Sequence, residues 1–459
     1  MAHRGTDRRS SRRLSRRQVL GSAAGAMAVG VSIRFGTRAE AQAANLQSWG
    51  FNAVETNPLA YGRFRAFQEA YPEIIVELSP DSDTQRILTA AVSETLPDLL
   101  WLGRGVLNSY IARGSVLRPL SDLIERDSYD LSRFYPAAIE ESTYDDQIWG
   151  IPGGMDVGAL FVNVDALAEV GVSDVTTLSS TEYQQLIDLG AQLTTREGDV
   201  VTRWGFDPKT QDGQFYEWAQ AAGAQILGGD DGLQPQFNSA GVVGVVEQAI
   251  PAYEAQGGYQ TYEAVRSSWQ NDEQFARGQV AMTVYQNWMA GIIASTVPER
   301  NFRVLPLHPN SDPSAISAVS GGNAWCISEN SQNVDAAWEF IKFMHSDETW
   351  MTGAQTVKAA REAAGQPYLP SLTGVPAVDQ RQIDELYVPI APQWDEAVQL
   401  FPQILAASSK RPLSPSPYAQ QLDQILIQTG VLPALRGERP VQEAMDAAQA
   451  EAESAVSGF

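Results

Sequence analysis

The segment 275–289, FARGQVAMTVYQNWM, joins the pattern of a buried strand to a cluster of aromatic and amide side chains. Its centre, 280–284, is apolar and partly β-branched, which predicts a short buried strand. Before it, residues 273–276 predict a short helical run that Gly278 can end. Residues 285–288, YQNW, follow directly. Ligands of open α/β sheets bind beyond strand ends, so these side chains favour a polar ligand with apolar faces, such as a sugar.

The residues alone leave two interpretations open for the end of this segment. Asn287 and Trp288 either face a ligand, or they form a turn and cover the core. The string Phe-x-x-Gly-x-x-Ala-Met at 275–282, followed by Trp288, resembles the extracellular solute-binding proteins of sugar ABC transporters. That family includes the maltose- and trehalose-binding proteins.

Further segments along the chain resemble the same family, and together they extend from about residue 46 to 455. They are Pro97-Asp98, the segment 110–120, Gly150-Ile151-Pro152, 159–165, Gly321 to Ser328, 336–341, Arg411-Pro412, Tyr418, Gly437, Glu443 and Ala444. One departure is Phe161-Val162, where the family has paired aromatic residues. The resemblance implies an α/β, periplasmic-binding-protein type II fold with two lobes, discontinuous domains and a central ligand cleft. It places 44–155 plus 317–375 in lobe 1, and 156–316 plus 376–459 in lobe 2.

The first 43 residues carry the pattern of an export signal. Six arginines lie within residues 8–17, and Arg16 and Arg17 fit a twin-arginine signal. Residues 21–33 form a weakly apolar stretch that is too short to span a membrane, and small residues after it offer cleavage sites. We therefore expect export of a folded precursor and removal of about 41–43 residues. The alternative is a basic tail followed by a helix.

The amino-acid composition restricts which classes of partner the protein can bind and in which compartment it is expected. The 459 residues are 44% hydrophobic, enough for a sizeable core and two domains. The net charge of −23 becomes −30 when residues 1–43, with nine Arg and two acids, are removed. Such acidity argues against nucleic acid or anionic lipid as a partner. Cys326 is the only cysteine, so an internal disulfide and a lipid-modified N-terminal cysteine are both excluded. We expect a soluble, monomeric periplasmic or extracellular protein without membrane insertion.

Strand and helix patterns alternate at the start of the mature chain. Strands are predicted at 46–49, 74–78 and 96–101, with helices at 61–71 and after a cap at 80–83. This βαβ alternation favours a mostly parallel sheet whose three strand exits share one edge.

A second cluster of patterns lies near the middle of the chain. Residues 316–327 predict strand, turn and strand, with Gly321 and Gly322 in the turn. Residues 333–344 predict an amphipathic helix with Trp338 in the core.

Candidate ligand-binding residues combine strand exits with the places that the resemblance implies. The first-lobe candidates are Asn52, Glu55, Asp81, Trp101, Asp156, Gly321 and Gly322, and the second-lobe candidates are Tyr216, Trp218, Asn287 and Trp288. Arg361 is added from its place after a helical region. The resemblance also implies an aromatic platform at Trp325, close to two glycines that permit backbone approach to a ligand. The alternatives are that Tyr216, Trp218 and Trp325 pack in the core.

Motifs of catalysis are missing from the sequence. It contains no His-Glu-x-x-His, no paired Cys, no P-loop and no Gly-x-Ser-x-Gly. We expect no enzyme activity, no metal and no cofactor, but a substrate-binding protein that delivers a carbohydrate, such as a di- or oligosaccharide, to ABC permease subunits. Two alternatives stay open: an exported carbohydrate-active enzyme with a carboxylate pair, and the same fold for a polyol, compatible solute or peptide.

Overall fold

The computed structural model describes residues 43–230, 232–269 and 272–457. These described residues belong to one compact unit. The predicted twin-arginine signal lies outside the described residues except for Ala43 and therefore stays a prediction. Across the described ranges, no helix is long and apolar enough to cross a membrane.

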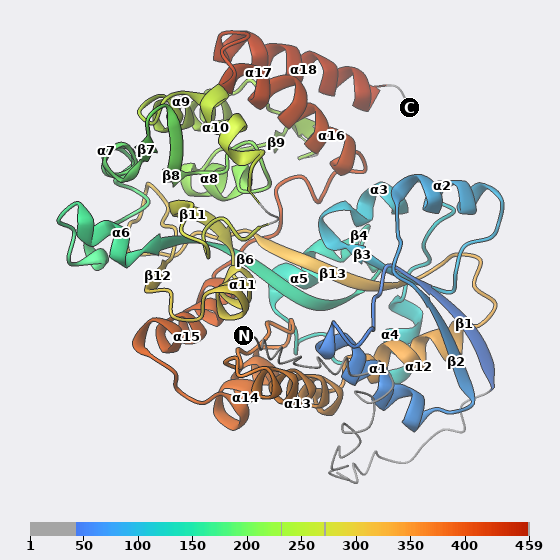
Figure 1. Cartoon of the computed structure of the whole chain (residues 1–459). Coiled ribbons are helices and arrows are strands. Elements are labelled where there is room, and N and C mark those ends of the chain that lie inside the picture. The colour runs from blue at the N-terminus through green and yellow to red at the C-terminus, as the bar shows by residue number, and fades with distance from the viewer. Residues whose placement is uncertain (1–42, 231, 270–271, 458–459) are drawn as a thin grey trace, which may run out of the picture. The chain divides into compact units, whose positions relative to one another are not determined.

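A nine-stranded mixed sheet runs through the unit in the order β2-β1-β3-β13-β6-β11-β8-β7, and β12 also pairs with β6 (Figure 1). Its strands are β1 (Ala44–Trp49), β2 (Ile74–Ser79), β3 (Leu99–Gly103), β6 (Ile151–Asn163), β7 (Thr195–Glu197), β8 (Val200–Asp207), β11 (Val280–Gln286), β12 (Phe302–Leu305) and β13 (Ser320–Ile327). Two small hairpins pair β4 (Thr143–Tyr144) with β5 (Gln147–Ile148), and β9 (Leu227–Gly228) with β10 (Gln234–Pro235).

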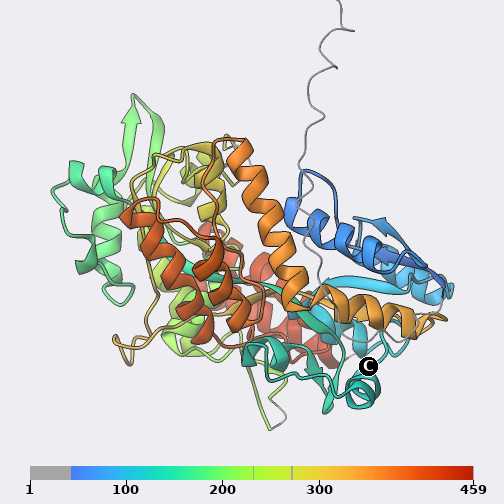
Figure 2. The same ribbon diagram turned by 90° about the horizontal axis from the view of Figure 1, so that it is seen from below.

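Helices surround this sheet. They are α1 (Pro58–Ala70), α2 (Thr84–Val92), α3 (Leu107–Ile111), α4 (Ser121–Asp127), α5 (Pro136–Glu141), α6 (Val164–Glu169), α7 (Tyr183–Leu193), α8 (Phe215–Ala222), α9 (Ala240–Glu254), α10 (Tyr259–Arg266), α11 (Met289–Thr296), α12 (Val334–Met344), α13 (Asp347–Ala363), α14 (Pro376–Leu386), α15 (Pro392–Ala406), α16 (Ala419–Ile425), α17 (Leu432–Leu435) and α18 (Val441–Ser457). Short 3-10 turns at Arg104–Val106 (η1) and Val175–Thr177 (η2) and a π-helix at Leu426–Val431 (η3) complete the list. The long helix α13 contacts α1 and α14, and α14 contacts α15 (Figure 2).

The predicted βαβ start of the chain is confirmed. β1 pairs in parallel with β2 and β3, and α2 begins after Asp83, whose carboxylate accepts the Arg86 N–H at 3.1 Å. β3 begins at Leu99, later than expected. Pro97 has no N–H to donate, and the Asp98 carboxylate accepts the Gln47 N–H at 3.0 Å. The remainder of the sheet is mixed rather than mostly parallel, because β13 and β6 run antiparallel to their neighbours.

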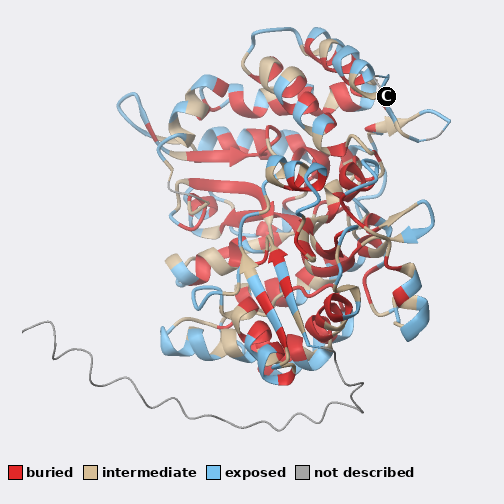
Figure 3. Ribbon diagram, turned by 90° about the vertical axis from the view of Figure 1, so that its right-hand side faces the viewer, coloured by how far each residue is buried: buried red, intermediate tan, exposed pale blue. Residues whose placement is uncertain are grey.

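β6 connects the two ends of the sheet. Its first part, from Ile151 to Val157, pairs with β13, and its second part, from Gly158 on, pairs with β11 and β12. The largest apolar cores divide accordingly: Ile151 packs in one of them, and Leu160 in the other. The central strands are buried (red in Figure 3).

Two sequence expectations about turns are wrong. Gly321 and Gly322 do not form a turn: they lie within β13, which continues past a bulge between Gly322 and Asn323. Pairing with β6 on both sides of the bulge keeps the segment extended, and Gly322 supplies the required φ of +125°. Residues 274–278 form turns where a short helical run was predicted. Gly278, with φ of +77°, then directs the chain into β11.

Candidate functional site

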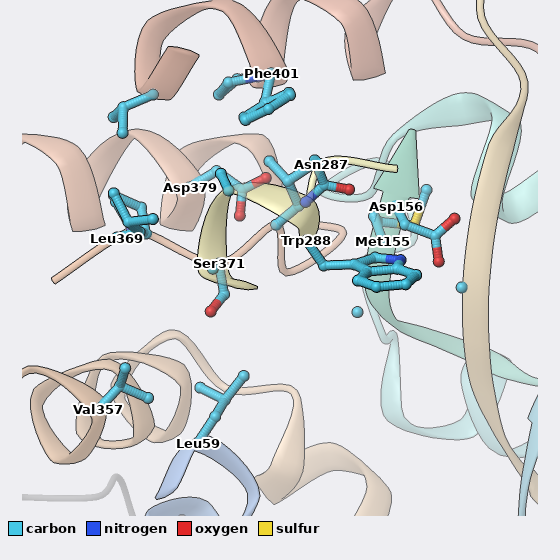
Figure 4. A pocket seen from close by; sticks show the side chains of 18 of the residues that line it. Leu59, Met155, Asp156, Asn287, Trp288, Val357, Leu369, Ser371, Asp379 and Phe401 are labelled. Carbon is cyan, nitrogen blue, oxygen red and sulfur yellow. The ribbon is translucent and has the colours of Figure 1, made fainter. Parts of the chain in front are cut away.

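A pocket of about 390 Å³ lies beside the middle of β6, where the pairing partner of this strand changes from β13 to β11 (Figure 4). β3, β6, β13 and the segment after β11 supply one side of its lining. The other side comes from α1, α11, α13, α14, α15 and the segment 369–372. The volume falls within the range of about 300–1,000 Å³ that is usual for small-molecule sites.

Trp288 presents the aromatic surface of this pocket. It lies two residues beyond the end of β11 and directly before α11, so its side chain leaves the sheet and stays 42% exposed. Its ring stands at 82° to that of Tyr285, with 4.9 Å between the centroids. Tyr285 is buried and thereby supports the indole from one edge.

Asn287 is fixed to β6 through its backbone and its side chain. Its N–H donates to the Val157 carbonyl at 2.9 Å, and its Oδ1 accepts the Val157 N–H at 3.1 Å. Among the described residues, its Nδ2 has no hydrogen-bond partner. Asn287 therefore brings an oriented donor to the pocket.

Asp156 supplies a carboxylate to the same wall, near Trp288 (Figure 4). No described residue donates a hydrogen bond to it. Burial raises its pKa, opposed by the charge of Arg104. The carboxylate lies against Gly321, where an added Cβ would come within 1.9 Å of Asp156 Oδ1. Gly321 thus makes room for Asp156 and does not line the pocket itself.

Arg104 holds the strands under this wall. It is fully buried and donates to Glu141 Oε2 at 3.0 Å. The same guanidinium donates to the carbonyls of Gly154 at 3.2 Å and Asn323 at 3.0 Å. A buried charge needs such partners, and these tie β6 to β13 at the pocket floor. The sequence showed Arg104 only as a residue at a strand exit.

Arg361 lines the pocket from α13. Its Nη1 donates to Ser295 Oγ at 2.7 Å and to Gln366 Oε1 at 2.8 Å. The bond to Ser295 connects α13 to α11, and burial lowers the pKa of the guanidinium.

Six predicted residues are brought together by the pocket. They are Trp101, Asp156, Asn287, Trp288, Gly322 and Arg361. Asn52, Glu55 and Asp81 are exposed and lie outside its lining. The Asp81 carboxylate faces Arg86 at 3.5 Å.

The three buried aromatic candidates occupy the core. Tyr216 is 1% exposed and donates to Asp423 Oδ1 at 2.6 Å, and Trp218 is 5% exposed and donates to the Pro208 carbonyl at 2.8 Å. Trp325 is 0% exposed and has no face open to a ligand, which contradicts the platform expectation. Its position in the middle of β13 places it against Phe340 of α12, with 5.0 Å between the ring centroids.

Sequence reasoning missed most of the pocket lining that comes from α1, α14, α15 and the segment 369–372, and it also missed Asn323 of β13. The polar ones are Asn323, Ser371 and Asp379. Asp379 Oδ1 accepts the backbone N–H and the hydroxyl of Thr373, both at 2.7 Å, and Tyr135 donates to Oδ2 at 3.2 Å. Burial raises the pKa of Asp379 to about 7. One feature of the sequence could have indicated Asp379: it is an acidic residue at a position of α14 where the helical spacing calls for an apolar one.

The pocket combines an aromatic face, a fixed amide donor and a carboxylate, which suits hydrogen bonding to a polar ligand. No group of acidic, histidine or cysteine side chains suited to a metal occurs among the described residues.

Comparison with known proteins gives consistent matches. The family model for "Bacterial extracellular solute-binding protein" matches residues 62–387. The lactose-binding protein of Rhizobium radiobacter is 22% identical over 264 residues, which cover 56% of this chain and 59% of that protein. The structure of maltose-bound MalE3 of T. maritima aligns with a TM-score of 0.69 and 19% identity, covering 90% of this chain and 100% of that one. The tagatose-bound ABC transporter solute-binding protein of Thermotoga lettingae gives a TM-score of 0.69 and 19% identity, covering 89% and 99%.

Proposed function

Because this chain belongs to the family of bacterial extracellular solute-binding proteins, we propose that it binds a carbohydrate in the pocket and delivers it to the permease subunits of an ABC importer. The observation that carries the proposal is the wall of Trp288, Asn287 and Asp156. The sugars named for its relatives, lactose, maltose and tagatose, support the same ligand class.

Each member of this wall matches one feature of a pyranose. The exposed face of Trp288 can cover the apolar C–H face of the ring. The Asp156 carboxyl oxygens can accept hydrogen bonds from sugar hydroxyls. Asn287 Nδ2 donates to a ring or hydroxyl oxygen. Trp101, Gly322 and Arg361 complete the proposed ligand-binding set.

We propose that the two ends of the sheet act as lobes that close on the ligand. The proposed lobes are 44–155 plus 317–375, and 156–316 plus 376–459. The two largest apolar cores support this division, and a third core, with Met155 and Phe161, contains residues of both proposed lobes. The helix α14 is an exception to these bounds. It is assigned to the first lobe, because Val378 and Leu386 pack in the same core as Ile151.

The segments between the lobes lie side by side. Glu217 Oε1 accepts the Gly158 N–H at 3.1 Å, and its Oε2 accepts the Val319 N–H at 3.0 Å. Ser320 N–H donates to the Ser409 carbonyl at 2.8 Å, which adds a third segment. These neighbours support a hinge at which ligand-dependent closure is possible.

The location is proposed from the family and the first residues. An extracellular solute-binding protein acts outside the inner membrane, and the Arg16-Arg17 pair favours the twin-arginine route. Replacing both residues by Lys should leave precursor in the cytoplasm. Normal export of that variant would disprove the route without affecting the binding function.

Titration with sugars tests the proposed function. The purified protein is screened by thermal shift against mono-, di- and oligosaccharides, with polyols and peptides as comparison sets. A ligand that binds only the native state raises apparent stability, by about 2.7 kcal/mol at 100 times its Kd. Stoichiometric binding with unchanged sugar is expected. Sugar cleavage, or stabilisation by peptides or polyols alone, would contradict the proposal.

A further inference from the structure

The pocket continues beyond its polar wall into an apolar side. Figure 4 shows Trp288 and Asp156 at one side and Phe401, Leu369 and Val357 across the space from them. The apolar side is lined by aliphatic and aromatic side chains from α1, α13, α14, α15 and the segment 369–372, among them Leu59, Val357, Leu369, Ile383, Val398 and Phe401.

The elements of this apolar side bring three polar side chains to the pocket, Arg361, Ser371 and Asp379, among many more apolar ones. Asp379 lies there, but its carboxyl already accepts from Thr373 and Tyr135. A hydroxyl placed among Val398, Ile383 and Phe401 would lose its hydrogen bonds to water without replacement. A second sugar ring would therefore leave hydroxyls unpaired wherever it contacts these apolar residues, whereas an apolar group would not.

The space is also too large for a packing defect. Close-packed interiors contain few voids larger than a water molecule, whereas this pocket holds about 390 Å³ in one continuous volume. Phe401 and Val398 are each 7% exposed, so their remaining accessible surface borders the pocket. Apolar surface that faces an open pocket favours an apolar ligand group.

We propose that the apolar side accommodates the aglycone of a glycoside, so that the preferred ligand is a sugar linked to a flat apolar group such as an aryl ring. The inference rests on the proposed function, since the sugar part occupies the polar wall at Asp156, Asn287 and Trp288. In such a ligand the sugar lies against the polar wall, and the aryl group that is linked to it lies against the apolar side.

The test compares matched glycosides by calorimetric titration of the purified protein. For each of lactose, maltose and mannobiose, the p-nitrophenyl glycoside is measured beside the methyl glycoside. The aryl compounds should bind at least about tenfold tighter, since about 60 Å² of buried apolar surface suffices for that factor. Their binding should also show a more negative heat-capacity change.

A filled pocket supplies the structural control. Val357→Phe places a ring into the apolar side and should remove the aryl preference while the methyl glycosides still bind. Ala359→Phe adds the same ring to an exposed position of α13 and should leave the preference intact.

The outcomes separate the two proposals. Equal affinities for aryl and methyl glycosides in the unmodified protein would overturn the aglycone inference and leave sugar binding standing. Retained aryl preference in Val357→Phe, with normal melting, would also overturn it. Absence of binding by every glycoside and free sugar would overturn the proposed function, and the aglycone inference with it.

Discussion

Trp288 and Trp325 both lie in segments that resemble sugar-binding proteins, yet the fold gives them opposite environments. Trp288 is 42% exposed at the pocket, whereas Trp325 is 0% exposed in the core. Trp325 belongs to a strand with β3 on one edge and β6 on the other, and Phe51 and Phe340 pack on its ring. Trp288 stands where the chain has just left the sheet. A strand exit presents a side chain to a ligand, while the middle of a central strand buries it.

The largest effect expected from this comparison is on stability. Trp325→Ala should reduce the free energy of unfolding by about 3–5 kcal/mol, because it leaves a cavity among packed aromatic rings. Urea unfolding followed by circular dichroism measures the change. A loss below about 1 kcal/mol would show that the site collapses or that the ring is less well packed than described.

The next effect is on affinity. Trp288→Ala should weaken sugar binding roughly fifty-fold, since covering about 100 Å² of indole is worth about 2.5 kcal/mol. The melting temperature of the unliganded protein should change little, because the ring is partly exposed. Trp288→Phe is the matched control and should retain part of the affinity. Unaltered affinity in Trp288→Ala would end the proposed role of this residue.

A smaller effect on affinity is expected from a carboxyl group in the pocket, and none from an exposed one. Asp156→Asn replaces one of the two carboxyl oxygens by an amide nitrogen that cannot accept a hydrogen bond, and it should weaken sugar binding about tenfold, or about 1.4 kcal/mol. Asp81→Asn, outside the pocket lining, should leave affinity unchanged. Calorimetric titration of both variants at one pH gives the comparison. Equal losses would indicate a general charge effect.

A further expected effect is a dependence of stability on pH. Burial raises the pKa of Asp379 to about 7, above the ordinary value of 3.8, so the folded state binds more protons than the unfolded state between these pH values. Stability should therefore fall as pH rises from about 4 to 7, with this group contributing at most about 1.4 kcal/mol per pH unit.

The variant Asp379→Asn isolates this contribution. Its amide oxygen can still accept from Thr373, and its amide nitrogen can donate to the Tyr135 hydroxyl oxygen. The difference in unfolding free energy between variant and unmodified protein should change with pH across this range. A constant difference from pH 4 to 8 would show that Asp379 titrates normally.

Local sequence patterns predicted where helices and strands occur better than they predicted which strands pair with one another. The alternation at the start of the chain anticipated β1, β2 and β3, and the apolar run after Gly278 anticipated β11. The continuation of β13 through Gly321 and Gly322 depends on β6, which lies far away in the sequence and has no local signal.

The candidate site divides in the same way. Asn287 and Trp288 were found because they directly follow a strand. The apolar side at Ile383 and Phe401 was missed, since a helix residue facing a pocket has the same periodicity as one facing the core.

The position of β13 has a consequence for how the chain reaches this structure. β3 pairs with β1 on one edge, but its other edge is filled only by β13, where Trp101 stands opposite Trp325. During synthesis that edge stays open until most of the chain, including the whole of β11, has been made. Contacts of such high sequence separation form slowly, and an unpaired apolar strand edge invites association between chains. Early association between incomplete chains is therefore expected to start at β3.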